Sequence, residues 1–537
     1  MRFVIAFRPG VLKKNIVAAR PAAQRWHSLR RRRRDIVSMQ ACRTLVRLPL
    51  SLTFILGACA VGPDFQRPSA PGSATYVEAP LPQQVAAPAA GTAGAAQTLR
   101  QGNDLVRDWW TLFHSEPLNQ LVEEALRENP TLAAASAALR QAQETLAAGR
   151  GNLLLPAVNG QLGASRERIA GATIGLPFSE TFSLYNAQVT VSYTFDLFGA
   201  VRRQLEALQA QVDYEENQLR AARLALTANI VTAVIREAAL RDQIRALRDV
   251  ERLQRSGLQI VERRFELGAV TRSDVLAQRT ALAQTVASIP PLERQLVQTR
   301  HQLAVYLGKA PSELDVSAFA LSQMQLPADL PVSVASDLVH QRPDILAAES
   351  LLHVASAQVG VATANLYPQI TLGGNYGYTA LTTGQLFTAD SAVWGLSAGL
   401  VQPIFHGGAL AAQRRAAVAA FDQAAAVYRQ TVLTAFANVA DSLRALALDA
   451  QALEAQSDAY TQAQAATELA QTQFDNGSIS YLSLLTAQQQ YAQAAVAVVQ
   501  AQADRFTDTA ALFQALGGGW WNEPQSQAQT KPVARAQ

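Results

Sequence analysis

The sequence is poor in the residues that build disulfide networks, metal sites and catalytic triads. Its 537 residues include only two cysteines, Cys42 and Cys59, and six histidines, and only 16% of the residues are charged. The histidines after residue 58 are scattered, with no spacing that resembles a metal site or a nucleophile–His–acid arrangement; they are His114, His301, His340, His353 and His406. We therefore expect a protein that is not an enzyme and that needs no metal or cofactor.

Proline is missing from two long stretches, Gly199–Ile289 and Ile404–Glu523. In the first stretch, apolar residues recur at the spacing of packed helices, namely at Leu205, Leu208, Val212, Leu219 and Leu226. One helix over residues 199–265 would be roughly 100 Å long at 1.5 Å per residue, which no compact domain needs. The low charge and the long proline-free stretches together predict long packed helices.

Basic residues are concentrated at the N-terminus. Residues 1–58 carry 13 of the 46 Lys and Arg residues and one of the 42 acidic residues, so the remaining chain has a net charge of −8. The run Arg30–Arg34 taken alone resembles a nucleic-acid patch, but we interpret it as leader sequence before a second possible start at Met39. Leu48–Ile55 is apolar and too short to span a bilayer as a helix. Residues 1–58 therefore read as a secretory leader, and we expect no nucleic-acid partner.

The four residues Leu56–Cys59 resemble a bacterial lipobox. That resemblance implies acylation of the Cys59 thiol, cleavage before Cys59 and acylation of the new N-terminus as well, so all of the covalent lipid would be on Cys59. Several acyl chains anchor a protein stably, whereas one anchors it only marginally. Ala60 in place of an aspartate implies export to the outer membrane. Because Cys42 leaves with the leader, no disulfide can form within the mature chain.

The two halves of the chain repeat each other at a period of about 210 residues. The segment "RFELGAVTRSDVL" (Arg264–Leu276) matches "QFDNGSISYLSLL" (Gln473–Leu485), and "NLLLP" before residue 157 matches "NLYP" before residue 369. This period is far longer than that of a solenoid repeat, so it indicates a duplicated structural half. We expect Gly268 and Gly477 to permit sharp reversals, each followed by a return helix, and Pro290–Pro291 to kink the first of these helices.

Four short segments alternate between apolar and polar residues. Asn186–Phe195 alternates strictly, and Val158–Ser165 does so with more glycine. Two further apolar faces are formed by Ile370, Leu372, Tyr376 and Tyr378 and by Trp394, Leu396, Ala398 and Leu400. Ten residues is the length of a transmembrane strand, but a soluble sheet with one wet face gives the same pattern. Four strands cannot close a barrel, so a membrane interpretation requires several chains to share one.

The segments between these elements are assigned by composition. Residues 59–115 read as a lipidated segment, with an Ala/Pro/Gly-rich stretch at Ala79–Gly102 that we expect to be extended chain on the protein surface. Polar segments near 166–184 and 379–391 join the strand pairs. The two repeats cover 116–307 and 334–519, joined by a proline-bearing linker at 308–333 and followed by a polar tail at 520–537 that we expect to be disordered.

Several motifs together resemble the TolC-like outer membrane factors, in particular the NodT-type efflux outer membrane lipoproteins. The motifs span nearly all of the mature chain: "CAVGPDFQRP" (Cys59–Pro68), "WWTLFHSEPLNQLVEEALRENP" (Trp109–Pro130), "FDLFG" (Phe195–Gly199), "RPDILAAE" (Arg342–Glu349), "NLYPQITL" (Asn365–Leu372), "PIFHGG" (Pro403–Gly408) and "LFQALGGGW" (Leu512–Trp520). The resemblance implies a mixed α and β membrane protein. It implies a homotrimer in which each chain gives four strands to one twelve-stranded barrel and long helices to an α-barrel through the periplasm.

The same resemblance implies a function. The protein would be the outer membrane channel of a tripartite efflux pump, a passive exit duct anchored in outer membrane lipid and extending into the periplasm. An inner-membrane RND pump and a periplasmic adaptor would supply energy and substrate choice. Two rival functions remain at this stage, an exit duct for type I protein secretion and a lipid-anchored coiled-coil scaffold. The cargo stays open among drugs, metals, aromatic acids and dyes.

The resemblance also implies a periplasmic gate beside the second turn. Leu482 matches a leucine that narrows the duct in relatives, whereas Thr486 and Ser483 stand where relatives have carboxylates. In the first repeat, an acidic residue is retained at Asp274. We expect an apolar ring at Leu482, with the acidic ring weakened or moved to Asp274. Leu482 packed between neighbouring helices is the alternative.

Overall fold

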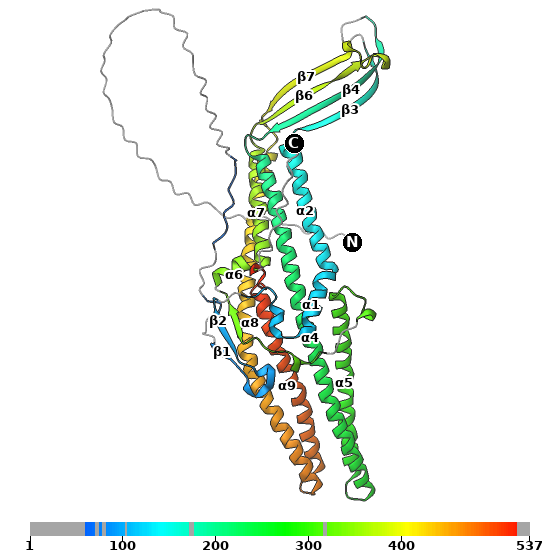
Figure 1. Ribbon diagram of the computed structural model, residues 1–537, viewed down its shortest axis with the longest axis vertical. Helices are drawn as coiled ribbons and strands as arrows, with labels where there is room; N and C mark the ends of the chain where they lie inside the picture. Colours follow the sequence, from blue (N-terminus) through cyan, green and yellow to red (C-terminus); the bar gives the residue numbers. More distant parts are fainter. Residues whose placement is uncertain are drawn as a thin grey trace, which may run out of the picture. The chain divides into compact units, whose positions relative to one another are not determined.

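The computed structural model describes residues 60–69, 75–77, 82–102, 105–170, 177–314, 319–333 and 335–522 (Figure 1). The predicted leader, the acylation site Cys59 and the tail from residue 523 lie outside the described residues. The two repeats are each represented by a strand pair, a long descending helix and a shorter return helix.

Four strands form one antiparallel sheet in the order β3-β4-β6-β7, as the alternating segments predict. Their bounds are Ala157–Ile169 for β3, Glu180–Phe195 for β4, Gln369–Ala380 for β6 and Ala392–Val401 for β7. The predicted bounds of the first joining segment, near 166–184, are wrong at both ends, because Arg166 pairs with Ser183 and Ile169 pairs with Glu180. Ladder hydrogen bonds involve only the backbone, so pairing continues where the side-chain alternation ends.

Two pairs of long helices hang from the strand ends, and Figure 1 shows each pair as a hairpin. The descending helices α4 (Ala200–Glu266) and α8 (Ala409–Asp475) have 67 residues each, and the return helices α5 (Arg272–Tyr306) and α9 (Tyr481–Ala515) have 35 each. The predicted first long helix is confirmed to within one residue. The return helix α5 continues through Pro290 and Pro291 as one helix.

Shorter helices complete the upper part of the bundle. Their bounds are Glu116–Glu128 for α1, Pro130–Leu154 for α2, Ala335–Gln341 for α6 and Pro343–Ala364 for α7. The Asn129 side chain caps α2 by accepting from the Thr131 amide at 2.9 Å. α2 and α7 pack on α4, and α7 also packs on α8. By length and composition alone α7 and α8 are apolar enough to cross a membrane, but 56% of the apolar window of α7 is buried among these neighbours.

The N-terminal segment is not the extended surface chain that its composition predicts. It contains β1 (Gln84–Val85), the 3-10 helix η1 (Pro88–Gly94) and β2 (Gln97–Gln101), and β2 pairs in parallel with β5 (Asp329–Val332) of the expected linker. Its alanines are small enough to let the backbone approach α8 and α9 closely, and Ala87 and Ala93 are buried in the main core. The remaining 3-10 turns are η2 (Trp109–Phe113), η3 (Pro311–Glu313), η4 (Leu321–Gln323), η5 (Thr383–Gln385), η6 (Ala389–Ser391) and η7 (Trp520–Asn522).

Candidate functional site

From the foot of the sheet to the level of Ala187, one face of the four-stranded sheet is apolar and the other is polar. Val191 of β4 lies opposite Val158 of β3 and Gly374 of β6, and residues paired in this way share a face. The same face carries Leu162 and Leu396, whose side chains are 81% and 83% exposed. A contiguous, exposed apolar surface of this kind suits hydrocarbon rather than water. The sheet therefore has a surface for lipid.

The opposite face is lined by amides and hydroxyls. Gln188 of β4 donates from Nε2 to Oε1 of its partner Gln161 at 3.2 Å, which places both side chains on this face. Thr190 of β4 lies two residues further along the strand, on the same face, and pairs with Asn375 of β6. Neutral polar groups hydrate readily, so this part of the face suits the wall of an aqueous passage. The acids on the same face, Glu167 and Glu180, lie at its far end.

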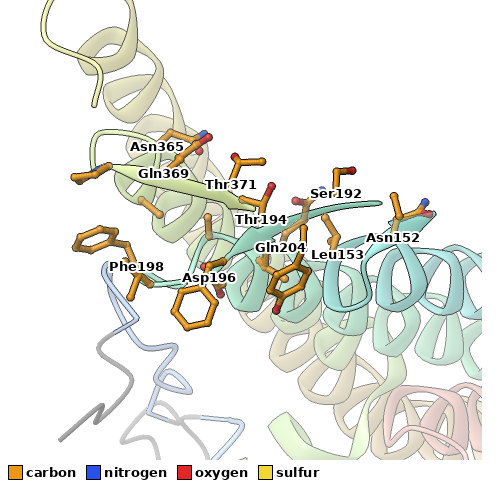
Figure 2. A pocket seen from close by; sticks show the side chains of 18 of the residues that line it. Asn152, Leu153, Ser192, Thr194, Asp196, Phe198, Gln204, Asn365, Gln369 and Thr371 are labelled. Atoms are coloured by element: carbon orange, nitrogen blue, oxygen red, sulfur yellow. The ribbon is translucent and has the colours of Figure 1, made fainter. Parts of the chain in front are cut away.

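The polar face continues into a cavity of about 370 Å³ at the foot of the sheet, shown in Figure 2. The end of α2, the feet of β4 and β6 and the start of α4 contribute its lining, with polar side chains from Asn152, Ser192, Thr194, Gln204 and Thr371. Asp196 in this lining is already engaged, since it accepts from the Arg202 amide at 3.1 Å and from Arg202 Nε at 3.3 Å. The cavity has the lining of a hydrated junction between strands and helices.

The N-terminal segment Ala60–Ser69 is held near this junction by a hydrogen bond and two ion pairs. Val61 donates its amide to the Phe198 carbonyl at 3.0 Å. Asp64 forms an ion pair of 2.5 Å with Arg203, and Arg67 forms one of 2.6 Å with Glu349. A Cβ on Gly199 would lie 2.7 Å from Ala60, so only glycine lets the chain pass so close.

The two helix reversals use the same local chemistry. Gly268 and Gly477 have φ values of +75° and +73°, a region that side-chain-bearing residues rarely adopt. After Gly268, Thr271 and Asp274 form a capping box in which Asp274 Oδ2 accepts from the Thr271 amide at 2.8 Å. After Gly477, the Ser480 hydroxyl accepts from the Ser483 amide at 3.2 Å. Asp274 and Ser483, two of the expected gate residues, thus serve as helix-start residues within one chain.

Leu482 and Leu485 differ sharply in exposure although they are neighbours on α9. Leu482 is 69% exposed, whereas Leu485 is 8% exposed and packs with Phe474 and Tyr481. The Thr486 hydroxyl donates to the Leu482 carbonyl at 2.9 Å, so Thr486 has a local hydrogen bond and carries no charge. An exposed leucine at a helix tip has no apolar partner within its own chain, among the residues that the structure describes.

The tips of the two hairpins are joined by contacts that the repeat motif alone did not reveal. Arg264 of α4 lies 4.6 Å over the Phe474 ring and is 3.2 Å from Asp475 of α8. The Tyr481 hydroxyl donates to Gln278, which in turn donates to the Gln254 carbonyl at 2.5 Å. Burial first, and then the charge of Asp274, raises the pKa of the Tyr481 hydroxyl above its ordinary value, so it stays a donor.

A signal for these contacts was present in the sequence. The first turn motif has an arginine where the second has Gln473, and the second has a tyrosine where the first has Arg272. Such departures from an internal repeat mark positions at which the two copies have different partners.

A second polar cluster lies higher up, where α8 and α9 meet the N-terminal segment. Arg505 is fully buried and donates from Nη2 to Gln97 Oε1 at 2.9 Å, while Gln97 Nε2 donates to the Thr509 hydroxyl at 3.3 Å. Burial, and next the neighbouring carboxyl of Asp508, raises the pKa of Asp449 to about 7. Burial lowers the pKa of the Arg505 guanidinium. These hydrogen bonds hold β2 against α9. The Asp449 carboxyl in the same cluster ionises only at a higher pH than an ordinary aspartate.

Two of the histidines, His353 and His340, take part in packing and hydrogen bonding. The His353 ring stacks on Phe65 at 4.3 Å between ring centroids, and its Nε2 lies 2.8 Å from Glu206. His340 lies 3.2 Å from Arg67. Within the described parts of the chain, His, Asp and Glu residues form no group of three placed to hold a metal ion.

Known proteins share this combination of sheet and hairpins. The family model of the outer membrane efflux protein matches residues 121–309 and 334–518. The pyoverdine export outer membrane protein OpmQ of Pseudomonas putida is 33% identical over 443 residues, which cover 81% of this chain and 92% of that protein. The toluene efflux pump outer membrane protein TtgC of Pseudomonas putida is 31% identical over 482 residues, which cover 89% and 96%. The solved structure of the outer-membrane channel OprN matches with a TM-score of 0.78 and 28% identity, over 86% of this chain and all of that one.

Proposed function

The chain belongs to the outer membrane efflux protein family, and from this premise we propose how its parts form an exit duct. An outer membrane efflux protein needs a surface for lipid and a path for water. The single observation that carries the proposal is a four-stranded sheet with an exposed apolar face, a polar face and two edges, β3 and β7, that pair with no further strand among the described residues. Three copies, each giving four strands, would close one twelve-stranded barrel and leave no edge in the membrane.

The helices extend this duct beneath the membrane. A helix of 67 residues is roughly 100 Å long at 1.5 Å per residue. Helices of this length suit an α-barrel that crosses the periplasm. In this arrangement conduction is passive, and a periplasmic adaptor and an inner-membrane RND pump supply the energy. The names of relatives such as the toluene efflux pump outer membrane protein support pump partners of this kind.

The cargo is a set of small molecules rather than one ligand. The relatives are named for pyoverdine and for toluene, which differ widely in size and polarity. The polar wall at Gln161, Gln188 and Asn375 consists of neutral amides, which do not favour one chemical class of solute. A duct of this composition leaves selection to the pump.

The N-terminus adds a lipid anchor at Cys59. The lipobox motivates this, and the hydrogen bond from the Val61 amide to the Phe198 carbonyl would hold the acylated residue near the level where the sheet begins. Mass spectrometry of the membrane-extracted protein should find Cys59 as the first residue, carrying lipid. An unmodified N-terminus at another residue would refute the anchor. Cys59→Ser should remove the lipid but spare barrel insertion, because the barrel is its own anchor.

The duct is narrowest at the hairpin tips, at Leu482. This side chain is largely exposed in one chain, which favours a position on the axis over packing between helices of the same chain. Three such leucines would form an apolar constriction that excludes water. Because Asp274 is held in its capping box and Thr486 is neutral, the constriction is mainly apolar.

Purified protein in detergent and in planar bilayers tests the proposal. Native mass spectrometry should give three chains per particle, and bilayers should show discrete channels. Deletion of the gene should sensitise cells to several unrelated toxic compounds, and the intact gene should restore resistance. A monomeric particle without channel activity would overturn the proposed duct.

A further inference from the structure

All charged residues of the four-stranded sheet lie near one end of it. They are Arg166, Glu167 and Arg168 of β3 and Glu180 of β4, whereas β6 and β7 contain none. Because α2 leads into the start of β3 and the end of β4 leads into α4, this end is the one farthest from the helices (Figure 1). With the helices in the periplasm, as proposed above, these charges lie at the outer surface of the membrane.

The pairing register separates the two signs of charge. Arg166 of β3 lies opposite Ser183 of β4. Arg168 lies opposite Thr181, two residues further along each strand. Ser183 and Thr181 belong to the same series of alternate β4 residues as Val191, and the residues of one such series share a face with their partners. Both arginines are therefore on the face that points to lipid in the proposed barrel, and the two glutamates are on the polar face.

Aromatic residues mark the level at which the apolar face ends. Tyr376 of β6 lies opposite Trp394 of β7 on this face, and its ring centroid is 6.1 Å from that of Tyr378. Tyr185 of β4 lies further from the helices and is the last aromatic residue of this face on its strand. Tyrosine and tryptophan are enriched where a membrane protein passes from hydrocarbon to headgroups. Contact with hydrocarbon therefore ends near Tyr185.

The depth of the two arginines follows from strand geometry. Phe195, at the foot of β4, and Tyr185 are ten residues apart, which is roughly 34 Å along the strand at about 3.4 Å per residue. A strand tilt of about 40° reduces this to roughly 26 Å across the membrane, close to the apolar band of about 25 Å expected for a barrel. Arg166 and Arg168 lie two and four residues beyond Tyr185, roughly 5 Å and 10 Å outside the band. The headgroup layer adds about 5–8 Å on each side of the hydrocarbon, so both long side chains can reach it.

Within the described residues, neither arginine has an acidic partner. Both side chains are exposed, and neither forms an ion pair there. Glu167 lies on the opposite face, where it accepts from the Ser165 hydroxyl at 3.0 Å. The turn at residues 170–179 contains no charged residue. Two positive charges about 7 Å apart on one face, without an acid beside them, attract an anion from the surroundings.

Phosphate is the anion that fits this position. The guanidinium group is a planar fork that binds two phosphate oxygens at once. The Ser183 and Thr181 hydroxyls lie beside the two arginines and can donate to the same anion. At headgroup depth on the outer surface, such phosphates belong to lipid A, the phosphorylated glycolipid that forms the outer leaflet of Gram-negative outer membranes.

We propose that Arg166 and Arg168 bind the phosphates of lipid A on the outer wall of the barrel. The inference rests on the proposed duct, because it requires the apolar face of the sheet to point to lipid. Each chain has one such site, so a trimer has three. Bound glycolipid would hold the barrel at one height in the membrane, with the aromatic residues at the edge of the hydrocarbon.

The parent protein gives the first test and needs no substitution. Purified trimers in detergent are mixed with lipid A carrying two phosphates, and bound lipid is counted by native mass spectrometry. Up to three molecules should bind per trimer. The same lipid without its phosphates should bind about 25-fold more weakly, the combined scale of two basic residues at an anionic lipid surface. Phosphatidylglycerol, with one phosphate, should bind about five-fold more weakly.

Substitutions locate the site. Arg166→Gln and Arg168→Gln should each weaken binding of diphosphorylated lipid A by about five-fold, and the double variant by about 25-fold. The matched control is Glu167→Gln with Glu180→Gln, which changes two charges at the same end of the sheet but on the other face. This control should not weaken binding.

The outcomes separate this site from the duct itself. Equal binding of lipid A with and without phosphates, or an arginine double variant that binds as the parent does, overturns the site. Equal affinity for phosphatidylglycerol overturns the choice of the glycolipid, and equal losses in the glutamate control overturn the assignment of the face. Conducting trimers that bind no lipid A overturn the site and leave the duct intact, whereas particles of one chain overturn the duct and this site with it.

Discussion

The two hairpins of this protein share one geometry and have different surfaces. Both consist of a helix of 67 residues and a return helix of 35, and both long helices begin after a glycine with φ of +83°. Yet α4 contains twelve arginines and α8 contains four. Duplication preserved the backbone because helix length and turn position set where the tips lie. The side chains diverged because each hairpin now has a different neighbour.

The divergence is visible position by position, at a shift of 209 residues. Arg264 corresponds to Gln473, and Ser273 corresponds to Leu482. The buried Leu240 corresponds to Asp449, whose pKa is raised. The first hairpin thus supplies the arginine of the ion pair and cation–π contact at the tip, and the second supplies the exposed leucine and Asp449. Substitutions at equivalent positions of the two halves test whether the two hairpins differ in their contributions to stability and conduction.

The largest effect is expected on the lipid face, where the halves should behave alike. Val191→Arg in β4 and Leu396→Arg in β7, which lie at the same level of the sheet on either side of Gly374, should each cost about 2–4 kcal/mol per chain, because each places a charge in hydrocarbon. Urea unfolding from bilayers measures this cost. Ser192→Arg, on the polar face, should cost much less. If Val191→Arg and Ser192→Arg assemble equally well, the assignment of the faces is wrong.

The next effect distinguishes the halves through pH. Asp449 has a raised pKa of about 7 when folded, so ionising it destabilises the folded chain increasingly as pH rises above about 4. Asp449→Asn should therefore stabilise the protein at pH 8 by about 1–2 kcal/mol, a value reduced for partial exposure, and change little at pH 4. Thermal midpoints at the two pH values measure this. A loss of stability at pH 8 would show that the carboxylate is paired instead. Leu240→Asn, at the matching position, should destabilise at both pH values.

A smaller effect is expected at the contact between the tips. Arg264→Ala removes the pair with Asp475 and the stacking on Phe474, and should cost about 1 kcal/mol. Hydrogen exchange at the second turn should become faster. Gln473→Ala, the equivalent change in the other hairpin, should alter exchange little. Equal effects from both variants would mean that Arg264 does not tie the hairpins together.

The smallest effect on stability should accompany the largest effect on conduction. Leu482→Ser should change stability by less than about 0.5 kcal/mol, because the side chain is exposed, and should raise single-channel conductance. Leu485→Ala, one turn away and buried, should cost about 2–3 kcal/mol and leave conductance nearly unchanged. Thr486→Asp should increase cation selectivity and block by multivalent cations. Unchanged conductance in intact Leu482→Ser trimers would place the constriction elsewhere.

Much of the fold could be predicted because it depends on local periodicity. Strict alternation at Asn186–Phe195 and the proline-free run after Gly199 predict the strand and helix that the structure shows. The N-terminal segment could not be predicted in this way. Its alanines and glycines suggest a surface chain, but they are small because the segment packs against α8 and α9, a fact that depends on residues more than 300 positions away.

The sequence by itself determined the elements, their order and the family, since helix and strand patterns, glycine turns and repeated motifs act over a few residues. Only the tertiary structure decided which residues meet. It joined Arg264 to Asp475 and Arg67 to Glu349, and it showed that Leu482 is exposed while Leu485 is buried. The physical reason is that burial and ion pairing depend on how separate helices pack, and no spacing along one helix records its neighbour.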